Sequence, residues 1–235
     1  MTTNADPPST ATEGVFNLSG QRLGRKGQET RERIIKAMQD LLAAEGSEPI
    51  TLRAVARTTG VGMSTLYLYF PDLGELLIAV LDRAMNQSDQ TFFALLRGRW
   101  PDEAIGDCAR EFVRAYFDFW RRHARLLQMR NSFADAADER LIRYRYDTLA
   151  PIVDLLVMQM DAAGTADVMC HDCAAVLLTS LERVATIFMA TGLPQVDVTA
   201  DGSDQPRDAD RMAIAQAKVI EVMIVAMRAR DQGEA

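Results

Sequence analysis

The sequence has few of the residues on which catalytic and metal-binding chemistry depends. Its 235 residues include only two histidines and three cysteines. It contains no GxSxG, HExxH or phosphate-binding glycine loop, the motifs that place a nucleophile, a zinc ion or a nucleotide. We therefore expect the protein not to be an enzyme and to need no cofactor.

The odd number of cysteines argues against a disulfide framework and favours a reducing compartment. Cys170 and Cys173 lie three residues apart and could offer two thiolates to a metal ion. A zinc site usually has four ligands, and Cys108 and His123 supply no ligand-like spacing for a second pair. The ordinary interpretation, two small core residues, is favoured over a metal or redox role, and we predict no metal site.

Long apolar runs and a net positive charge are also lacking. No uninterrupted apolar segment reaches membrane-spanning length, and the first twenty residues do not resemble a signal peptide, so we expect a cytoplasmic protein without a membrane contact. The net charge of −7 argues against a generally basic nucleic-acid-binding surface. Residues 20–70, however, contain eight Lys/Arg against five Asp/Glu, which leaves −10 for the rest. A modestly basic segment on an acidic body is typical of a DNA reader joined to another domain.

What the sequence does contain is the stretch TLRAVARTTGVGMSTLYLYF, residues 51–70, which predicts two short helices around a tight turn. Thr51 can cap the first helix through its hydroxyl. Gly60 can supply the turn, because glycine adopts left-handed backbone conformations without steric cost. Two helices joined by a short glycine-containing turn are the helix-turn-helix signature, in which the second helix enters the DNA major groove.

The second helix is expected to run to about Leu68, with one face buried and one face outward. We predict that Val61, Leu66 and Phe70 are buried. The residues expected to face outward are Ser64, Thr65 and Tyr67.

The residues before this motif predict a third helix and a basic arm. An apolar stripe over residues 29–44 predicts a helix that shares a core with the other two. Residues 1–20 have the composition of a disordered tail. Residues 21–28, QRLGRKGQ, form a basic arm that either lies along DNA through Arg22, Arg25 and Lys26 or is a solvated tail. We favour the arm because a DNA-binding motif follows it.

The rest of the chain has helical periodicity and no strand pattern. The fold class predicted is all-α, with a three-helix DNA-binding domain over residues 21–71 and a larger helical domain over residues 72–235. The expected segments of the larger domain are a connector helix at 72–97, helices at 102–123, 126–137, 138–163, 166–191 and 208–230, and a loop at 194–208.

Residues 29–81 resemble the tetracycline-repressor (TetR) family of transcriptional regulators. The resemblance is carried by Ile34-Ile35, Thr51-Leu52-Arg53-Ala54-Val55-Ala56, Gly60-Val61, Ser64-Thr65-Leu66-Tyr67, Tyr69-Phe70-Pro71 and Glu75-Leu76-Leu77. It implies a helical ligand-binding and dimerisation domain in the remainder, and a homodimer formed through the last two long helices, at about 166–191 and 208–230. Two-fold symmetry then implies a palindromic operator.

The resemblance also implies which residues contact DNA. Thr65 and Tyr67 match phosphate contacts, Tyr69 matches an aromatic residue that flanks the DNA or packs beneath it, and Arg53 can reach a flanking phosphate. Met63 and Leu68 could instead touch thymine methyl groups. The full set of expected DNA-binding residues is Arg22, Arg25, Lys26, Arg53, Met63, Ser64, Thr65, Tyr67, Leu68 and Tyr69.

Three positions depart from the family pattern and make the motif less cationic than usual. Gly62 replaces a frequent serine, Met63 replaces a polar residue, and Leu73 replaces a lysine that holds phosphate. These departures favour an alternative from another class: a helical ligand-binding or interaction protein with a degenerate, non-functional DNA-binding module.

Large aromatic and methionine side chains are concentrated in the larger domain. The ordinary interpretation is a core, but such residues can also line an apolar cavity, and the family houses a ligand there. Our first candidates for ligand contacts are Phe112, Tyr116, Trp120 and Met129, with a small hydrophobic or amphipathic effector. We therefore predict a ligand-responsive, homodimeric repressor.

A second group of cations lies in the same domain. It comprises Arg121, Arg122, Arg125, Arg130, Arg140, Arg143 and Arg145. These could meet an anionic head group. Solvated helix faces that pair with nearby Asp and Glu residues are the favoured interpretation.

Overall fold

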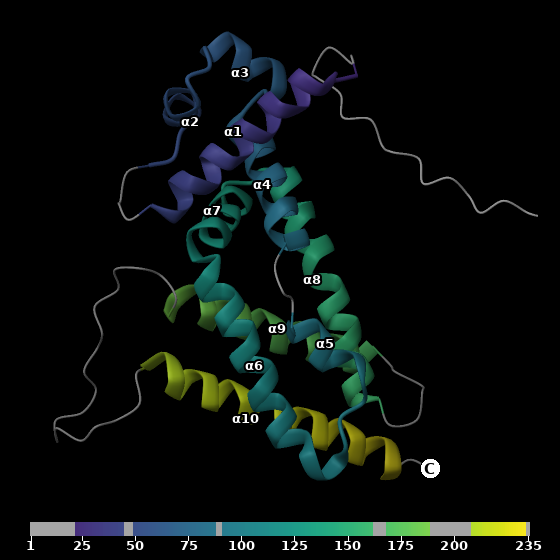
Figure 1. Ribbon diagram of the computed structural model, residues 1–235. Helices are drawn as coiled ribbons and strands as arrows, with labels where there is room; N and C mark the ends of the chain where they lie inside the picture. The colour runs from purple at the N-terminus through teal and green to yellow at the C-terminus, as the bar shows by residue number, and fades with distance from the viewer. Residues whose placement is uncertain (1–21, 45–48, 88–90, 162–167, 189–207, 234–235) are drawn as a thin grey trace, which may run out of the picture. The chain divides into compact units, whose positions relative to one another are not determined.

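The computed structural model describes residues 22–44, 49–87, 91–161, 168–188 and 208–233 (Figure 1). Within these ranges the protein contains ten α-helices, one 3₁₀ turn and no strand, which confirms the all-α fold class. The predicted disordered tail at 1–20 and most of the predicted loop at 194–208 lie outside the described residues.

The chain forms two compact units, residues 1–80 and residues 81–235. The division falls inside a helix, α4 (Leu73–Gln87), rather than at the predicted boundary between residues 71 and 72. No single helix among the described residues is long and apolar enough to span a membrane. Only α3 and α4, bent by 59° relative to each other, reach that length and composition together in this part of the chain.

The N-terminal unit contains α1 (Arg25–Ala43), α2 (Leu52–Thr59), α3 (Met63–Tyr69) and the first part of α4. Its core is built from the apolar stripe that the sequence predicts on α1 and from single residues of the shorter helices. The fully or almost fully buried side chains are Ile34, Ile35, Met38, Val55, Leu66, Phe70, Leu76, Leu77 and Val80.

Helix α1 begins at Arg25, four residues before its predicted start. Arg25 and Lys26 therefore lie in the first helical turn and not on a flexible arm. The Gln28 amide donates to the Gly24 carbonyl at 3.0 Å, so Gly24 caps the helix, and Arg25 pairs with Glu29 at 3.6 Å one turn later. These local contacts offset the low helix propensity of the glycines in this segment.

The second unit contains the remaining helices. They are α5 (Thr91–Arg97), α6 (Ile105–Arg122) after a 3₁₀ turn at Asp102–Ala104, α7 (Ala124–Asp135), α8 (Glu139–Met160), α9 (Val168–Phe188) and α10 (Asp208–Gly233). Within the predicted connector at 72–97, the structure describes α4 up to Gln87 and α5 from Thr91, and residues 88–90 lie outside the described residues.

Helix α10 packs along α6, and α8 packs against α7 and α9. A buried glutamine, Gln159 of α8, ties several of these segments together. Its side-chain amide donates to the Leu96 carbonyl at 2.8 Å and its oxygen accepts from the Trp100 amide at 2.9 Å. Arg228 of α10 donates to the Gln159 carbonyl at 2.8 Å and pairs with Asp102. The end of α10 is thereby fixed to α8 and to the 3₁₀ turn before α6.

Candidate DNA-binding site

The turn between α2 and α3 has the geometry that the sequence predicts. The Thr51 hydroxyl accepts a hydrogen bond from the Ala54 amide at 3.1 Å and caps α2. Gly60 follows the last residue of α2 with a φ of 69°, in the left-handed region. Both local predictions are confirmed, and together they set the direction in which α3 leaves the turn.

Helix α3 is held by one buried residue within it and one directly after it. Leu66 and Phe70 are buried as predicted, whereas Val61 is only half-buried. Val61 lies in the turn, beyond the end of α2, where fewer side chains surround it. Its amide donates to the Thr59 hydroxyl at 3.4 Å, so the turn is closed by a polar contact as well as by packing.

The outward face of α3 carries four of the ten expected DNA-binding residues. Ser64 and Thr65 are exposed, and so are two large side chains, Tyr67 at 46% and Leu68 at 52%. The other two, Met63 and Tyr69, are half-buried at the ends of the helix. The structure therefore places four of the six expected α3 residues on one accessible surface.

The cationic candidates lie on α2, on α1 and just before α1. Arg53 is exposed in the first turn of α2, and Arg25 and Lys26 are exposed in the first turn of α1. Arg22 is exposed just before α1. Arg57, in the last turn of α2, is a further exposed cation that the sequence prediction did not include.

The start of α4 is capped by Asp72, whose carboxylate accepts a hydrogen bond from the Glu75 amide at 2.9 Å. A side chain that accepts from the amide three residues later is the N-cap half of a capping box. Leu73, which stands where the family has a phosphate-binding lysine, is half-buried. A leucine at this position cannot bind phosphate, but its partly buried side chain can contribute to packing.

The four residues predicted to contact a ligand lie in the second unit. Phe112, Tyr116 and Trp120 are buried side by side on α6, and Met129 of α7 is half-buried. The ring centroids of Phe112 and Tyr116 are 6.2 Å apart. Burial raises the pKa of Tyr116 well above its ordinary value, so this hydroxyl stays protonated.

The hollows of this unit that the structure describes are lined by other residues. An open groove of about 730 Å³ lies between α5 and α8, with Phe93, Arg97 and Leu155 among its lining residues. A smaller hollow of about 170 Å³ lies between α6 and α10, beside Arg114 and Ile214.

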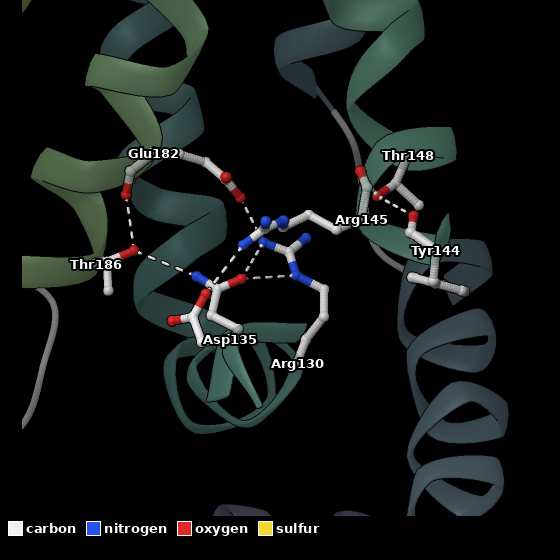
Figure 2. Close-up of polar contacts among 8 residues, drawn as sticks. Arg130, Asp135, Tyr144, Arg145, Thr148, Glu182 and Thr186 are labelled. Carbon is white, nitrogen blue, oxygen red and sulfur yellow. Dashed lines mark hydrogen bonds and ion pairs between the residues drawn. The ribbon is translucent and has the colours of Figure 1, made fainter. Parts of the chain in front are cut away.

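A buried ion pair joins α7 to α9, and sequence reasoning missed it (Figure 2). Arg130 pairs with Glu182, and their side chains are only 4% and 13% exposed. The Asn131 side-chain oxygen accepts from Arg130 at 3.1 Å, and its amide donates to the Thr186 hydroxyl at 3.5 Å. The partners are 52 residues apart in the chain, so no helical spacing could have indicated the pair.

The neighbouring arginines behave as the sequence predicts. Arg145 lies 3.5 Å from a carboxylate oxygen of Asp135, and Arg140 lies 2.7 Å from one of Asp138, on accessible helix faces. The Arg140 guanidinium holds the pKa of Asp138 below its ordinary value.

The two cysteines singled out in the sequence lie in the first turns of α9. Cys170 is buried and Cys173 is half-buried, and neither forms a disulfide. Among the residues that the structure describes, no group of three or more His, Cys, Asp or Glu side chains is arranged to hold a metal ion.

Apolar side chains are exposed along α9 and α10. The large ones are Val168, Met169, Val176 and Ile187 on α9, and Ile214, Val219, Val222 and Val225 on α10. Such a concentration on two helices of one unit is unusual for a surface that stays in water.

The fold and this site define a protein with a helix-turn-helix DNA-binding domain and a separate helical body. Residues 34–80 match the model of the family described as bacterial regulatory proteins, tetR family. These 47 residues, which contain α2, α3 and the second half of α1, are therefore similar to the DNA-binding domain of that family. The family and the relatives below are transcriptional regulators and not enzymes, which agrees with the prediction.

Several curated proteins are similar to this chain over part of its length. The HTH-type transcriptional repressor DrrR1 of Streptomyces coeruleorubidus is 38% identical over 109 residues, which cover 46% of this chain and 38% of the relative. The HTH-type transcriptional repressor KstR of Mycobacterium tuberculosis is 36% identical over 85 residues, covering 36% and 39%. KstR of Mycolicibacterium smegmatis is 37% identical over 93 residues, covering 39% and 46%. The matches thus span less than half the length of these relatives.

Proposed function

We propose that the protein is a ligand-responsive transcriptional repressor that binds a palindromic DNA operator as a homodimer. The observation that carries the proposal is the exposed face of α3. Tyr67 and Leu68 expose large apolar areas to water on a helix whose other side is anchored by Leu66. A helix that enters the major groove would bury this face against base edges and phosphates.

The proposed contacts divide into those that position the helix and those that read bases. Hydroxyl donors at Thr65 and Tyr67, and cations at Arg53 and at the start of α1, suit phosphates. Leu68 and Met63 suit thymine methyl groups, because they offer apolar contact and no hydrogen bond. Cations contribute through counterion release, so we expect each phosphate contact to add about one unit to the salt slope of binding.

The proposed dimer forms through α9 and α10, within the segments predicted at 166–191 and 208–230. Val219, Val222 and Val225 recur every three residues on α10 and are exposed, and Val176 is exposed on α9. A self-complementary apolar patch on two helices supports a two-fold interface. Two-fold symmetry of the protein in turn supports a palindromic operator.

The proposed effector is small and hydrophobic or amphipathic, and binds in the body near Phe112, Tyr116, Trp120 and Met129. It releases the operator only if it binds the DNA-incompetent state more tightly than the DNA-bound state. The buried indole of Trp120 offers a direct probe, since an effector beside it should change tryptophan fluorescence. A Trp120→Phe variant, with Trp100 retained, separates this signal from that of the second tryptophan.

DNA binding is tested with full-length protein and random-sequence duplexes across a salt series. We expect retarded complexes whose affinity falls linearly with the logarithm of salt concentration. Thr65→Ala should weaken binding to every duplex, whereas Leu68→Ala should change base preference and leave the salt slope unaltered. A protein with a degenerate module, the alternative function, would show no retarded complex and no salt slope.

The basic start of α1 needs a sharper test than deletion, because removing residues 1–28 also removes the first helical turn. The variant Arg22→Ala/Arg25→Ala/Lys26→Ala keeps the backbone and should weaken binding, lowering the salt slope by about one unit for each phosphate that these cations neutralise. If the affinity for DNA were unchanged, we would conclude that this segment is solvated and does not contact DNA.

The dimer is tested by sedimentation of Val222→Lys. A buried lysine at the proposed interface should shift the protein to monomers and abolish operator binding. Tyr146→Lys, which alters an exposed side chain on α8, is the matched control and should stay dimeric. A dimeric Val222→Lys protein would place the interface elsewhere.

A further inference from the structure

Helix α3 is too short to keep its own orientation. It has seven residues, of which only Leu66 is buried, and its N-cap residue, Gly62, makes no side-chain hydrogen bond. Isolated helices need about 12 to 15 residues to be even marginally stable in water, so packing must hold a helix of this length. Side chains that pack against the end of α3 therefore help to set the orientation of its exposed face.

One contact at that end comes from α1. Phe70 follows the last residue of α3, is 2% exposed, and donates its amide to the Leu66 carbonyl at 3.0 Å. The guanidinium carbon of Arg31, on α1, lies 5.2 Å from the centroid of the Phe70 ring. Arg31 is half-buried, and a partly desolvated cation over an aromatic face is held more strongly than one in open water.

We propose that Arg31 is a positioning residue for DNA reading, acting through its stack on Phe70. The stack links α1 to the end of α3, so the basic start of α1 and the exposed face of α3 keep one fixed geometry and can meet the same DNA site together. This inference rests on the proposed DNA-binding function and adds a residue that acts without touching DNA.

The two roles open to an arginine near DNA differ in what its removal does. Removing a phosphate contact weakens binding to all sequences and lowers the salt slope by about one unit. Removing a positioning contact leaves the phosphate count unchanged but impairs contacts to base edges, which need a defined helix orientation. The ratio of specific to non-specific affinity therefore separates the two roles.

The experiment uses full-length protein, a duplex enriched from a random library by the wild type, and a scrambled duplex of equal length. The variants are Arg31→Met, which keeps the side-chain length without charge, Arg31→Lys, Phe70→Leu, and the double variant Arg31→Met/Phe70→Leu. Arg33→Met is the matched control, because it removes an exposed charge from the same helix away from the Phe70 ring.

We expect Arg31→Met to weaken binding to the enriched duplex about tenfold, equivalent to about 1.4 kcal/mol, with little effect on the scrambled duplex and an unchanged salt slope. Arg31→Lys should recover part of the affinity, and Phe70→Leu should add little in the Arg31→Met background, since both remove the same stack. A salt slope lowered by about one unit, equal weakening on both duplexes, or additive effects would overturn the proposal.

Hydrogen exchange of the free protein provides a readout that does not need DNA. If Arg31 holds α3, the amides of Leu66 and Phe70 should exchange faster in Arg31→Met than in the wild type, while those of α2 stay unchanged. Equal exchange would contradict the positioning role even if DNA binding changed. If the wild type enriched no duplex, the proposed function would fail, and the exchange rates would still decide whether the stack holds α3.

Discussion

Breaking the buried pair between Arg130 and Glu182 should cost the body more stability than breaking any exposed pair, and replacing both partners should restore most of it. Both side chains are almost entirely removed from water, so each charge depends on its partner to offset the cost of desolvation. Arg130→Met leaves a buried carboxylate without its cation. Glu182→Leu leaves a buried guanidinium that still donates to the Asn131 side-chain oxygen but has no carboxylate beside it among the described residues.

The magnitudes follow from this burial. Removal of one member of a buried pair lowers the free energy of unfolding by about 3 to 5 kcal/mol. We expect a loss of about 4 kcal/mol for Glu182→Leu and about 3 kcal/mol for Arg130→Met. The second loss is smaller because the carboxylate that remains, Glu182, keeps more access to water than Arg130 does. The double variant should lie within about 1.5 kcal/mol of the wild type, since apolar replacement of both partners is often close to neutral.

The assay is urea unfolding followed by circular dichroism, at one fixed protein concentration because dimerisation would shift the midpoint. Asp107→Asn, which breaks the exposed pair of Asp107 with Arg110, is the control and should change stability by less than about 1 kcal/mol. Additive destabilisation in the double variant, about 7 kcal/mol in all by the values above, would refute the reasoning that each charge is costly only when its partner is absent.

Three further perturbations test other parts of the structure. Thr51→Ala should destabilise the N-terminal unit by about 1 kcal/mol in thermal unfolding, because it removes the α2 cap, whereas Thr58→Ala on the exposed face of the same helix should have a smaller effect. Gly60→Ala should cost about 1 kcal/mol through backbone strain alone, since no atom lies within 4 Å of an added Cβ, and an unchanged melting temperature would contradict that. Burial and a neighbouring arginine lower the pKa of His123 below 6.5 in the folded protein. As the pH falls, the His123 imidazole is therefore protonated in the unfolded chain at a higher pH than in the folded protein. Stability should then fall between about pH 7.5 and about pH 5.5 more in the wild type than in His123→Asn, and equal decreases would argue against it.

Features that depend on residues close together in the chain could be predicted from the sequence. The Thr51 cap, the Gly60 turn and the buried Leu66 each follow from short-range patterns, and all three are present. The early start of α1 at Arg25 was missed because two glycines in the segment suggested a flexible arm.

The contacts that depend on tertiary structure could not be predicted. Arg130 was expected on a solvated face because other arginines and acids surround it in the sequence, yet its partner Glu182 comes from a helix about fifty residues away. The stack of Arg31 on Phe70 was missed for the same reason, since it joins residues on different helices. Helical periodicity assigns a residue to a face, but it does not say which side chain of another helix meets that face.

The exposed face of α3 is proposed to read DNA as part of a dimer, and all other functional proposals depend on this one. Selection of duplexes from a random library by the full-length protein, followed by sequencing, is its decisive test. We predict enrichment of an inverted repeat whose half-sites are separated by about 10 base pairs, or a multiple of that, from centre to centre. A library that remains unenriched, or an enriched sequence without two-fold symmetry, would show that the proposal is wrong.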